Sequence, residues 1–195
     1  MKNKLNLPEL ESKKVFAYFE ELAAIPHGSR NTRQISDYLI SFAKEHGFDY
    51  VQDEMNNVII YKPATPGYEN APTVILQGHM DMVCEKRPDV QHDFEKDGLN
   101  LSVKDGYVTA NGTTLGGDDG IAVAYALALL DSTDLPHPAL EVLITVDEEI
   151  GLLGAVGLDC SVLKGKRMIN MDSEAEGSLW ISCAGGLSAV SHIPV

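Results

Sequence analysis

The chain has few cysteines, few basic residues and no long hydrophobic run. Its three cysteines form neither a C-x-x-C pair nor a disulfide framework, and they stand alone at Cys84, Cys160 and Cys183. Such sparse cysteine use favours a reducing cytoplasm over a secreted fold. The strongest apolar run, Ile121 to Leu130, is too short to span a bilayer. No apolar stretch follows Lys2 and Lys4, so we expect no signal peptide.

Positive charge is scarce. Lys and Arg number 15 against 29 Asp and Glu, which gives a formal net charge of −14 over 195 residues. A chain this acidic lacks the long-range attraction that nucleic acids and anionic membranes require, so we expect neither as a partner. The remaining composition, 44% hydrophobic and 23% charged, is that of a globular protein and excludes disorder and fibre. The length suits one domain or one and a half.

The hydrophobic pattern alternates between two periods. Helical spacing predicts helices over 15–23, 32–46 and 121–130, whereas short apolar runs predict strands over 48–53, 58–62, 73–77, 140–146 and 167–171. A hairpin is predicted within 99–108, turning at Asp105-Gly106. This alternation predicts an α/β fold in which a layered, mixed sheet carries helices on both faces.

Three of the predicted strands run directly into histidine or carboxylate residues. The strand at 73–77 leads into His79 and Asp81, the strand at 140–146 into Asp147-Glu148-Glu149, and the strand at 167–171 into Asp172. A glycine-rich stretch adds Asp118-Asp119 at the start of a helix. Because layered α/β sheets place their chemistry beyond the carboxyl ends of the strands, we expect these four segments to meet at one edge.

Each piece also has an ordinary structural explanation. Asp147-Glu148-Glu149 could be an exposed acidic turn, although its position after a buried strand favours neutralisation by a cation. His79 and Asp81 could be a buried pair, or a metal-bound imidazole oriented by a carboxylate two residues away. Asp118-Asp119 could cap the helix, and Asp172 could belong to a simple turn.

Together the pieces favour a carboxylate-rich metal site. One histidine and several carboxylates suit two metal ions that share a bridging carboxylate and activate a water molecule, with a neighbouring carboxylate as the base. Rival chemistries lack their motifs, because 112–120 has no Lys-Ser/Thr of a phosphate loop and the chain has no G-x-S-x-G elbow. We expect His27 to be a loop residue rather than a ligand.

Five stretches of the sequence resemble the bacterial aminoacyl-histidine dipeptidases, also called cytosol nonspecific dipeptidases, within the co-catalytic zinc exopeptidases. In chain order the matching stretches are Ile25-Pro26-His27, Gln77-Gly78-His79-Met80-Asp81-Met82-Val83, Thr114-Leu115-Gly116-Gly117-Asp118-Asp119-Gly120, Asp147-Glu148-Glu149-Ile150-Gly151 and Asn170-Met171-Asp172-Ser173-Glu174. The resemblance covers nearly the whole chain. It implies a zinc-exopeptidase-like catalytic domain.

The resemblance also implies a role for each site residue. His79 and Asp172 would bind one metal ion, Asp118 would bridge both ions, and Glu149 would bind the second. Glu148 would be the general base, and Asp81 would orient His79. The implied cofactors are two zinc ions, with manganese or cobalt as alternatives, and a cis peptide bond is expected between Asp118 and Asp119.

Members of this family are much longer than this chain. The resemblance implies that 1–182 is the N-terminal part of a truncated catalytic domain and that 183–195 begins a second, lid or dimerisation domain. A further metal-binding histidine would lie beyond, so the second metal site is expected to be incomplete, because His192 is too close to the domain junction to replace it. The sheet is expected to keep an open edge.

The predicted function is metal-dependent hydrolysis of dipeptides, Xaa-His and broader, by a cytoplasmic enzyme that is a homodimer at full length. One alternative is a related metallo-exopeptidase or an amidohydrolase acting on N-acyl amino acids. The other is a metal-binding fragment without turnover.

Overall fold

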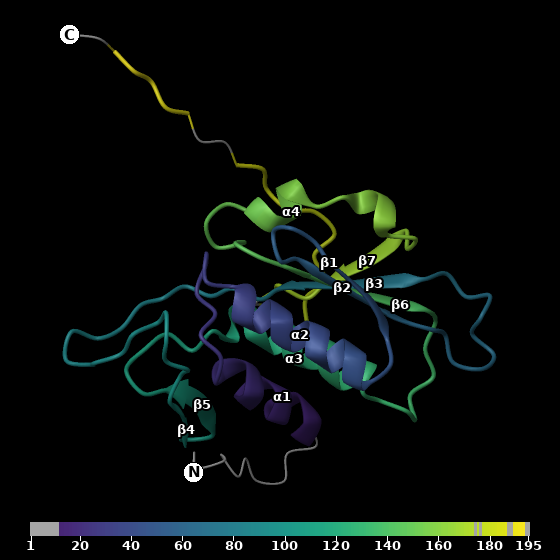
Figure 1. Ribbon diagram of the computed structural model, residues 1–195, viewed down its shortest axis with the longest axis horizontal. Coiled ribbons are helices and arrows are strands. Elements are labelled where there is room, and N and C mark those ends of the chain that lie inside the picture. Colours follow the sequence, from purple (N-terminus) through teal and green to yellow (C-terminus); the bar gives the residue numbers. More distant parts are fainter. Residues whose placement is uncertain (1–11, 174, 176, 187–188, 194–195) are drawn as a thin grey trace.

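The chain forms a five-stranded mixed sheet and a separate hairpin, seen in a computed structural model that describes residues 12–173, 175, 177–186 and 189–193 (Figure 1). Lys2, Lys4 and Glu174 lie outside the described residues. In spatial order the sheet contains β1 (Asp49–Gln52), β2 (Val58–Lys62), β6 (Leu140–Thr145), β3 (Val74–His79) and β7 (Arg167–Asn170). The hairpin pairs β4 (Leu101–Lys104) with β5 (Tyr107–Ala110) and turns at Asp105-Gly106, as predicted.

Strand direction divides the sheet into two parts. β1, β2 and β6 pair antiparallel, whereas β6, β3 and β7 run parallel. Parallel strands end at the same edge of a sheet, so residues that follow β3, β6 and β7 are brought together. The register places His79, the last residue of β3, beside Thr145 at the end of β6.

Helices cover the two faces of the sheet unequally. The long helices α1 (Lys13–Ala23), α2 (Arg33–Glu45) and α3 (Gly117–Leu130) lie on one face, and the short helix α4 (Leu153–Gly157) lies on the other (Figure 1). The predicted α/β fold with helices on both faces is therefore confirmed. α4 and the 3₁₀ turn η1 (Cys160–Val162) were not predicted, because elements this short show no periodicity.

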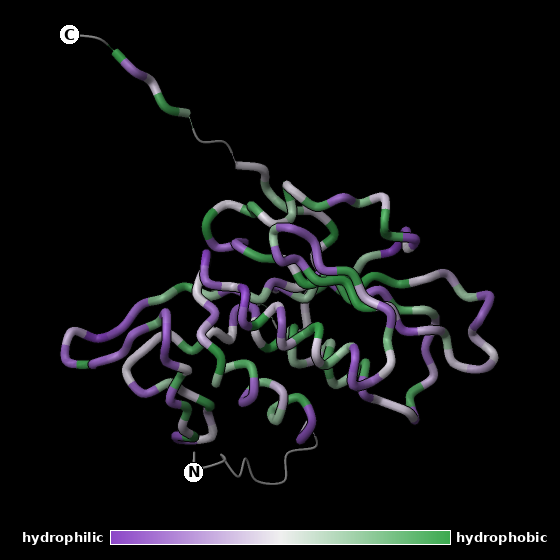
Figure 2. Tube along the Cα trace, viewed as in Figure 1, coloured by the Kyte–Doolittle hydropathy of each residue, from purple (hydrophilic) through white to green (hydrophobic). Residues whose placement is uncertain are grey.

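The main hydrophobic core lies between the sheet and the three long helices. All six residues of β6 are buried, as expected for a central strand covered on both sides, and hydrophobic positions concentrate in the sheet (Figure 2). α3 is apolar nearly all round because it lies between the sheet and α1. On the opposite face, a smaller cluster joins Ile59, Ile75 and Leu143 to residues from 158–163.

One buried acidic residue of β6 has a structural role. The Glu141 carboxylate accepts hydrogen bonds from the backbone N–H groups of Lys164 and Gly165, at 3.0 Å to each. These bonds satisfy a charge that would otherwise be costly to bury. They also fix the segment that leads into β7 and so toward Asp172.

The carboxyl-terminal part of the described chain is exposed. Every residue of β7 is exposed, and among the described strands β7 pairs with β3 alone, so it forms an edge of the sheet. Residues 178–186 and 189–193 form no helix or strand and are exposed. The assignment of 183–195 to a second domain stays a prediction. No helix among the described residues has the length and hydropathy needed to cross a membrane.

Candidate metal centre

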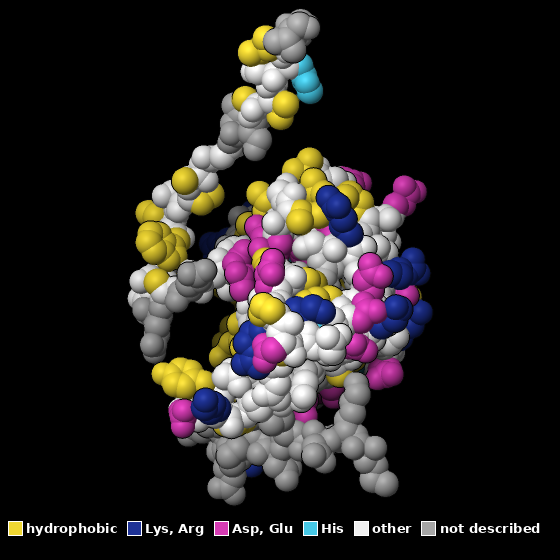
Figure 3. Space-filling view, turned by 90° about the vertical axis from the view of Figure 1, so that its left-hand side faces the viewer, with side chains coloured by type: hydrophobic (Ala, Val, Ile, Leu, Met, Phe, Trp, Pro, Cys, Tyr) yellow, Lys and Arg dark blue, Asp and Glu magenta, His cyan; other side chains and the backbone are white. Residues whose placement is uncertain are grey.

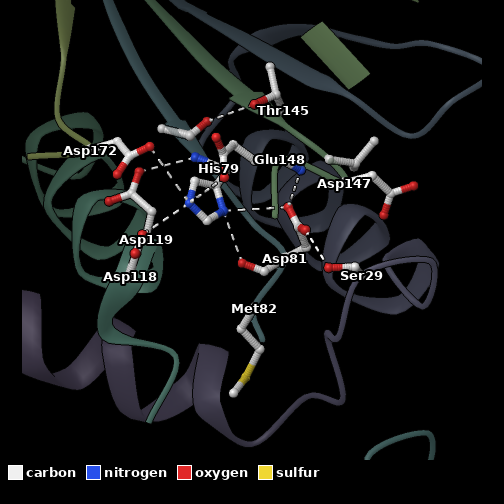
Figure 4. A network of polar contacts seen from close by, with 12 residues as sticks. Ser29, His79, Asp81, Met82, Asp118, Asp119, Thr145, Asp147, Glu148 and Asp172 are labelled. Atoms are coloured by element: carbon white, nitrogen blue, oxygen red, sulfur yellow. Dashed lines mark hydrogen bonds and ion pairs between the residues drawn. The ribbon is translucent and has the colours of Figure 1, made fainter. Parts of the chain in front are cut away.

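The four predicted segments meet at the carboxyl edge of the parallel strands. His79 ends β3, Glu148 and Glu149 follow β6, and Asp172 follows β7. Asp118 comes from the first turn of α3, where the peptide bond between Asp118 and Asp119 is cis, as the resemblance implied. Figure 4 shows the side chains of Asp118, Glu148 and Asp172 gathered around the His79 imidazole. On the side of the molecule drawn in Figure 3, acidic side chains gather near the middle of the face.

The Nε2 atom of His79 lies at the centre of the acidic group. It is 3.1 Å from Asp118 Oδ1 and 3.9 Å from both Glu148 Oε2 and Asp172 Oδ2. The imidazole itself is buried, with 1% of its side chain exposed, whereas 56% of the Asp118 side chain is exposed. One nitrogen of a fixed ring is therefore presented to a set of carboxylate oxygens at the surface.

The ligand atoms fall into three overlapping sets. Within each set, one atom per residue lies within 4.8 Å of the others, and the sets are His79, Asp118 and Glu149; His79, Glu148 and Asp172; and Asp118, Asp119 and Asp172. Each predicted metal ligand belongs to at least one set. The overlap suits ions that share ligands, and the division of the residues between two ions stays a prediction.

The other nitrogen of the imidazole contacts Asp81. His79 Nδ1 lies 3.0 Å from the backbone carbonyl oxygen of Asp81 and 3.4 Å from its carboxylate Oδ1. Both atoms accept hydrogen bonds, so they favour a proton on Nδ1 and leave Nε2 available to a cation. The sequence indicated the carboxylate as the partner, and the structure adds the carbonyl at the shorter distance.

The Asp81 carboxylate also reaches two other segments. Its Oδ1 accepts a hydrogen bond from the backbone N–H of Glu148 at 3.0 Å, and its Oδ2 accepts one from the Ser29 hydroxyl at 2.8 Å. Burial alone would raise the pKa of Asp81, but the hydrogen bonds from His79, Glu148 and Ser29 lower it below its usual range. Asp81 is therefore kept ionised although it is buried.

Negative charge exceeds positive charge in this site. Burial lowers the pKa of His79, but Asp81, Asp119 and Asp172 outweigh that effect and raise the pKa to about 9. Burial raises the pKa of Glu148 and of Glu149, and neighbouring carboxylates raise both further, with His79 opposing them. One imidazole among the five carboxylates of the ligand sets is a donor set that a divalent cation would neutralise.

One oxygen of the Asp119 carboxylate faces β3, although the residue also belongs to the ligand set with Asp118 and Asp172. Asp119 is buried, and its Oδ2 accepts a hydrogen bond from the backbone N–H of His79 at 3.1 Å. Burial raises the pKa of Asp119 to about 7, against the opposing effect of His79. The sequence analysis treated Asp118 and Asp119 as one unit, but their side chains have different surroundings in the structure. Asp119 supports the backbone of His79.

Sequence reasoning missed three contributors to the site, Ser29, Arg30 and Asn57. Besides Ser29, the backbone N–H of Arg30 donates to Asp147 Oδ1 at 2.6 Å, and Asn57 bonds both ends of the segment that carries Glu148 and Glu149. Asn57 Oδ1 accepts from Val146 N and its Nδ2 donates to Gly154 O, each at 3.0 Å. The nearest sequence signals were the Ile25-Pro26-His27 stretch, which precedes Ser29 and Arg30, and the strand predicted over 58–62, which begins next to Asn57.

His27 lies in a loop, as expected. It is buried, its Nδ1 contacts the backbone oxygen of Ile25 at 2.6 Å, and burial lowers its pKa. His27 belongs to none of the three ligand sets. His192 lies in the exposed segment at 189–193, outside those sets as well.

Known proteins resemble this chain in sequence and in fold. Residues 75–176 match the model of Peptidase family M20/M25/M40. The chain is 42% identical over 187 residues to the cytosol non-specific dipeptidase of Escherichia coli (strain K12), covering 96% of this chain and 39% of that protein.

Solved structures agree with the sequence match. The aminoacylhistidine dipeptidase of Vibrio alginolyticus aligns with a TM-score of 0.84 and 44% identity, over 87% of this chain and 34% of that chain. A tripeptidase of Staphylococcus aureus aligns with a TM-score of 0.70 and 27% identity, over 84% of this chain and 44% of that one. This chain thus spans about two fifths of the length of these relatives. The family match covers more than half of the chain and includes all four segments of the site, so the chain belongs to Peptidase family M20/M25/M40.

Proposed function

We propose that this chain supplies most of the metal centre of a dipeptidase that hydrolyses a peptide bond with water. The observation that carries the proposal is the convergence of His79, Asp118, Asp172 and the Glu148-Glu149 pair at one edge of the sheet. The relatives named as dipeptidases support this choice of reaction. Because the chain spans 39% of the E. coli protein, the activity belongs to the protein at that greater length.

Two metal ions would fit the donor set, with zinc as the proposed ion and manganese or cobalt as alternatives. His79, Asp118 and Asp172 would hold one ion, and Asp118 and Glu149 would hold the second. When bound, the ions would polarise the substrate carbonyl and make water more acidic. Three protein ligands suffice for an open catalytic site, whereas two carboxylates bind more weakly. This chain is therefore proposed to complete only the first site.

Glu148 is the proposed general base. Its raised pKa brings the carboxylate closer to the pH at which a base both accepts and returns a proton efficiently. The backbone N–H of Glu148 donates a hydrogen bond to Asp81, which fixes the backbone at this residue. The Glu148 carboxylate then lies beside the His79 imidazole. Glu148 would take a proton from the attacking water and pass it to the leaving amine.

The proposed substrates are dipeptides, Xaa-His among them, on the strength of the relatives' names. We place the protein in the cytoplasm, because its three cysteines are free and the E. coli relative is named as a cytosol enzyme. A homodimer at full length stays a prediction.

A chimera tests the proposed function. This chain would replace the matching N-terminal region of the E. coli dipeptidase, and the product would be assayed on Xaa-His dipeptides, other dipeptides and N-acyl amino acids. We expect dipeptide hydrolysis that is lost on chelation and restored by zinc, and negligible turnover by the 195-residue chain alone. A folded, zinc-loaded chimera without dipeptide hydrolysis would overturn the proposal. Preference for N-acyl amino acids would favour the amidohydrolase alternative.

A further inference from the structure

The loop between α1 and α2 contacts the metal centre from outside the ligand set. Ser29 Oγ donates to Asp81 Oδ2 at 2.8 Å, and Arg30 N donates to Asp147 Oδ1 at 2.6 Å. Figure 4 shows Ser29 beside Asp81, on the far side of that carboxylate from the imidazole. We call these two hydrogen bonds the loop clamp.

The first bond of the loop clamp fixes the rotation of one carboxylate. Asp81 Oδ1 has two neighbours, the Glu148 N–H at 3.0 Å and His79 Nδ1 at 3.4 Å. A carboxylate can meet both only at one rotation about its side-chain bonds. Ser29 bonds the opposite oxygen, Oδ2, and so opposes rotation away from that orientation.

The second bond of the loop clamp joins two unusual backbone positions. Arg30 has φ 68° and Asp147 has φ 54°, both in the left-handed region that residues other than glycine seldom adopt. The conformation at Asp147 directs the chain from β6 into Glu148 and Glu149. The Asp147 side chain then accepts the N–H of Arg30, so each left-handed residue supports the position of the other.

We propose that Ser29 and Asp147 are positioning residues that set the geometry of His79 and Glu148 through the loop clamp. They act through Asp81 and the backbone, and neither belongs to the three ligand sets. The inference rests on the proposed function, since it concerns how this chain presents the proposed ligand and the proposed base. It adds a segment 50 residues upstream of His79 to the machinery of the site.

Metal affinity of the 195-residue chain tests the first bond. Ser29→Ala removes the hydroxyl, Ser29→Thr keeps it, and Ser41→Ala is the control, because the Ser41 hydroxyl bonds only within α2 to Asp37 O. Substituting groups that orient a metal ligand commonly costs 10–100-fold in affinity. We expect Ser29→Ala to weaken zinc binding about tenfold, Ser29→Thr to restore it within about threefold, and Ser41→Ala to leave it unchanged. The visible spectrum of bound cobalt should change in Ser29→Ala alone.

A measurement without metal tests the same bond. Hydrogen exchange of the Glu148 amide should be slow in the parent chain and in Ser29→Thr, because Asp81 accepts that N–H, and faster in Ser29→Ala. Thermal unfolding identifies any variant that has lost its fold. If Ser29→Ala does not fold, the second pair of variants decides the matter.

That second pair concerns Asp147. Asp147→Gly removes the acceptor without strain at positive φ, whereas Asp147→Asn keeps an acceptor oxygen for Arg30 N. We expect Asp147→Gly to weaken zinc binding about tenfold and Asp147→Asn to weaken it much less. Equal zinc affinity in the parent, Ser29→Ala and Asp147→Gly would overturn the loop clamp and leave the proposed function standing. Absence of zinc binding in the parent itself would overturn the metal centre, and this inference with it.

Discussion

The site consists of a buried half and an exposed half that differ in what fixes them. His79, Asp81 and Asp119 are 1–2% exposed and bond to one another or to backbone from other segments. By contrast, the side chains of Asp118, Glu148 and Asp172 are 56%, 28% and 31% exposed. The buried half is therefore part of the packed interior. The exposed half presents carboxylates to whatever the site binds.

This difference implies a division of labour. Residues of the buried half should matter for folding as well as for metal binding, because their removal leaves buried partners without hydrogen bonds. Residues of the exposed half should matter for metal binding and turnover with little effect on the fold.

The largest expected effect is on turnover. In the chimera with the E. coli dipeptidase, Glu148→Gln keeps the shape of the side chain but cannot accept the proton, so we expect kcat to fall about 10²–10⁴-fold. The metal content measured by atomic emission should stay unchanged. Glu149→Ala is the matched variant and should lose metal from one site. Loss of both metals in Glu148→Gln would reverse the two roles.

The next effect is on stability. In the metal-free chain we expect His79→Ala to lower the free energy of unfolding by roughly 2–3 kcal/mol, since it truncates a buried, hydrogen-bonded side chain. Asp172→Asn should lower it by less, by up to about 1 kcal/mol, because its side chain lies in the exposed half and its contact with His79 is partly screened by solvent. Urea unfolding with a chelator measures both. If both variants lost the same free energy of unfolding, the buried and exposed halves would not differ in their contribution to the fold.

A smaller effect concerns pH. His79 has a pKa of about 9 in the folded chain and about 6.5 when unfolded, so its protonation stabilises the metal-free fold below pH 6.5. That contribution is lost as the pH rises from 6.5 to 9. Burial raises the pKa of Asp119 to about 7, so the folded state favours its neutral form. Its contribution to stability is therefore also lost as the pH rises, at lower pH than that of His79. Stability should therefore fall toward pH 9.

Unfolding at pH 6 and pH 9 in the presence of a chelator measures this decline. His79→Ala is the control and should show a shallower decline than the parent. Added zinc should reduce the decline in the parent, because the ion replaces the proton on His79. The same slope in parent and variant would show that other groups cause the pH dependence.

Short-range patterns in the sequence predicted the strands of the sheet and the acidic residues that follow them. Apolar runs marked β3 and β6, and strand ends marked His79 and Glu148, because parallel strands bring their carboxyl ends together. The Asp172 position followed from the same logic, whereas a glycine-rich stretch at the start of a helix marked Asp118. The division of roles within Glu148-Glu149 came only from the family resemblance, since adjacent carboxylates do not differ in pattern.

Long-range side-chain contacts could not be predicted. Ser29 lies 52 residues from Asp81, and Asn57 lies 89 residues from Val146, so their bonds depend on how separate segments pack. Glu141 interrupts an apolar strand, and its partners at 164–165 become visible only in the fold. These contacts are the ones that orient the site.

Zinc titration of the 195-residue chain by calorimetry is the decisive test of the proposed metal centre. We expect one tight ion at His79, Asp118 and Asp172, a second ion bound weakly by Asp118 and Glu149, and loss of the tight site in His79→Ala. Absence of a tight site, two sites of equal affinity, or a tight site that survives His79→Ala would rule out this metal centre.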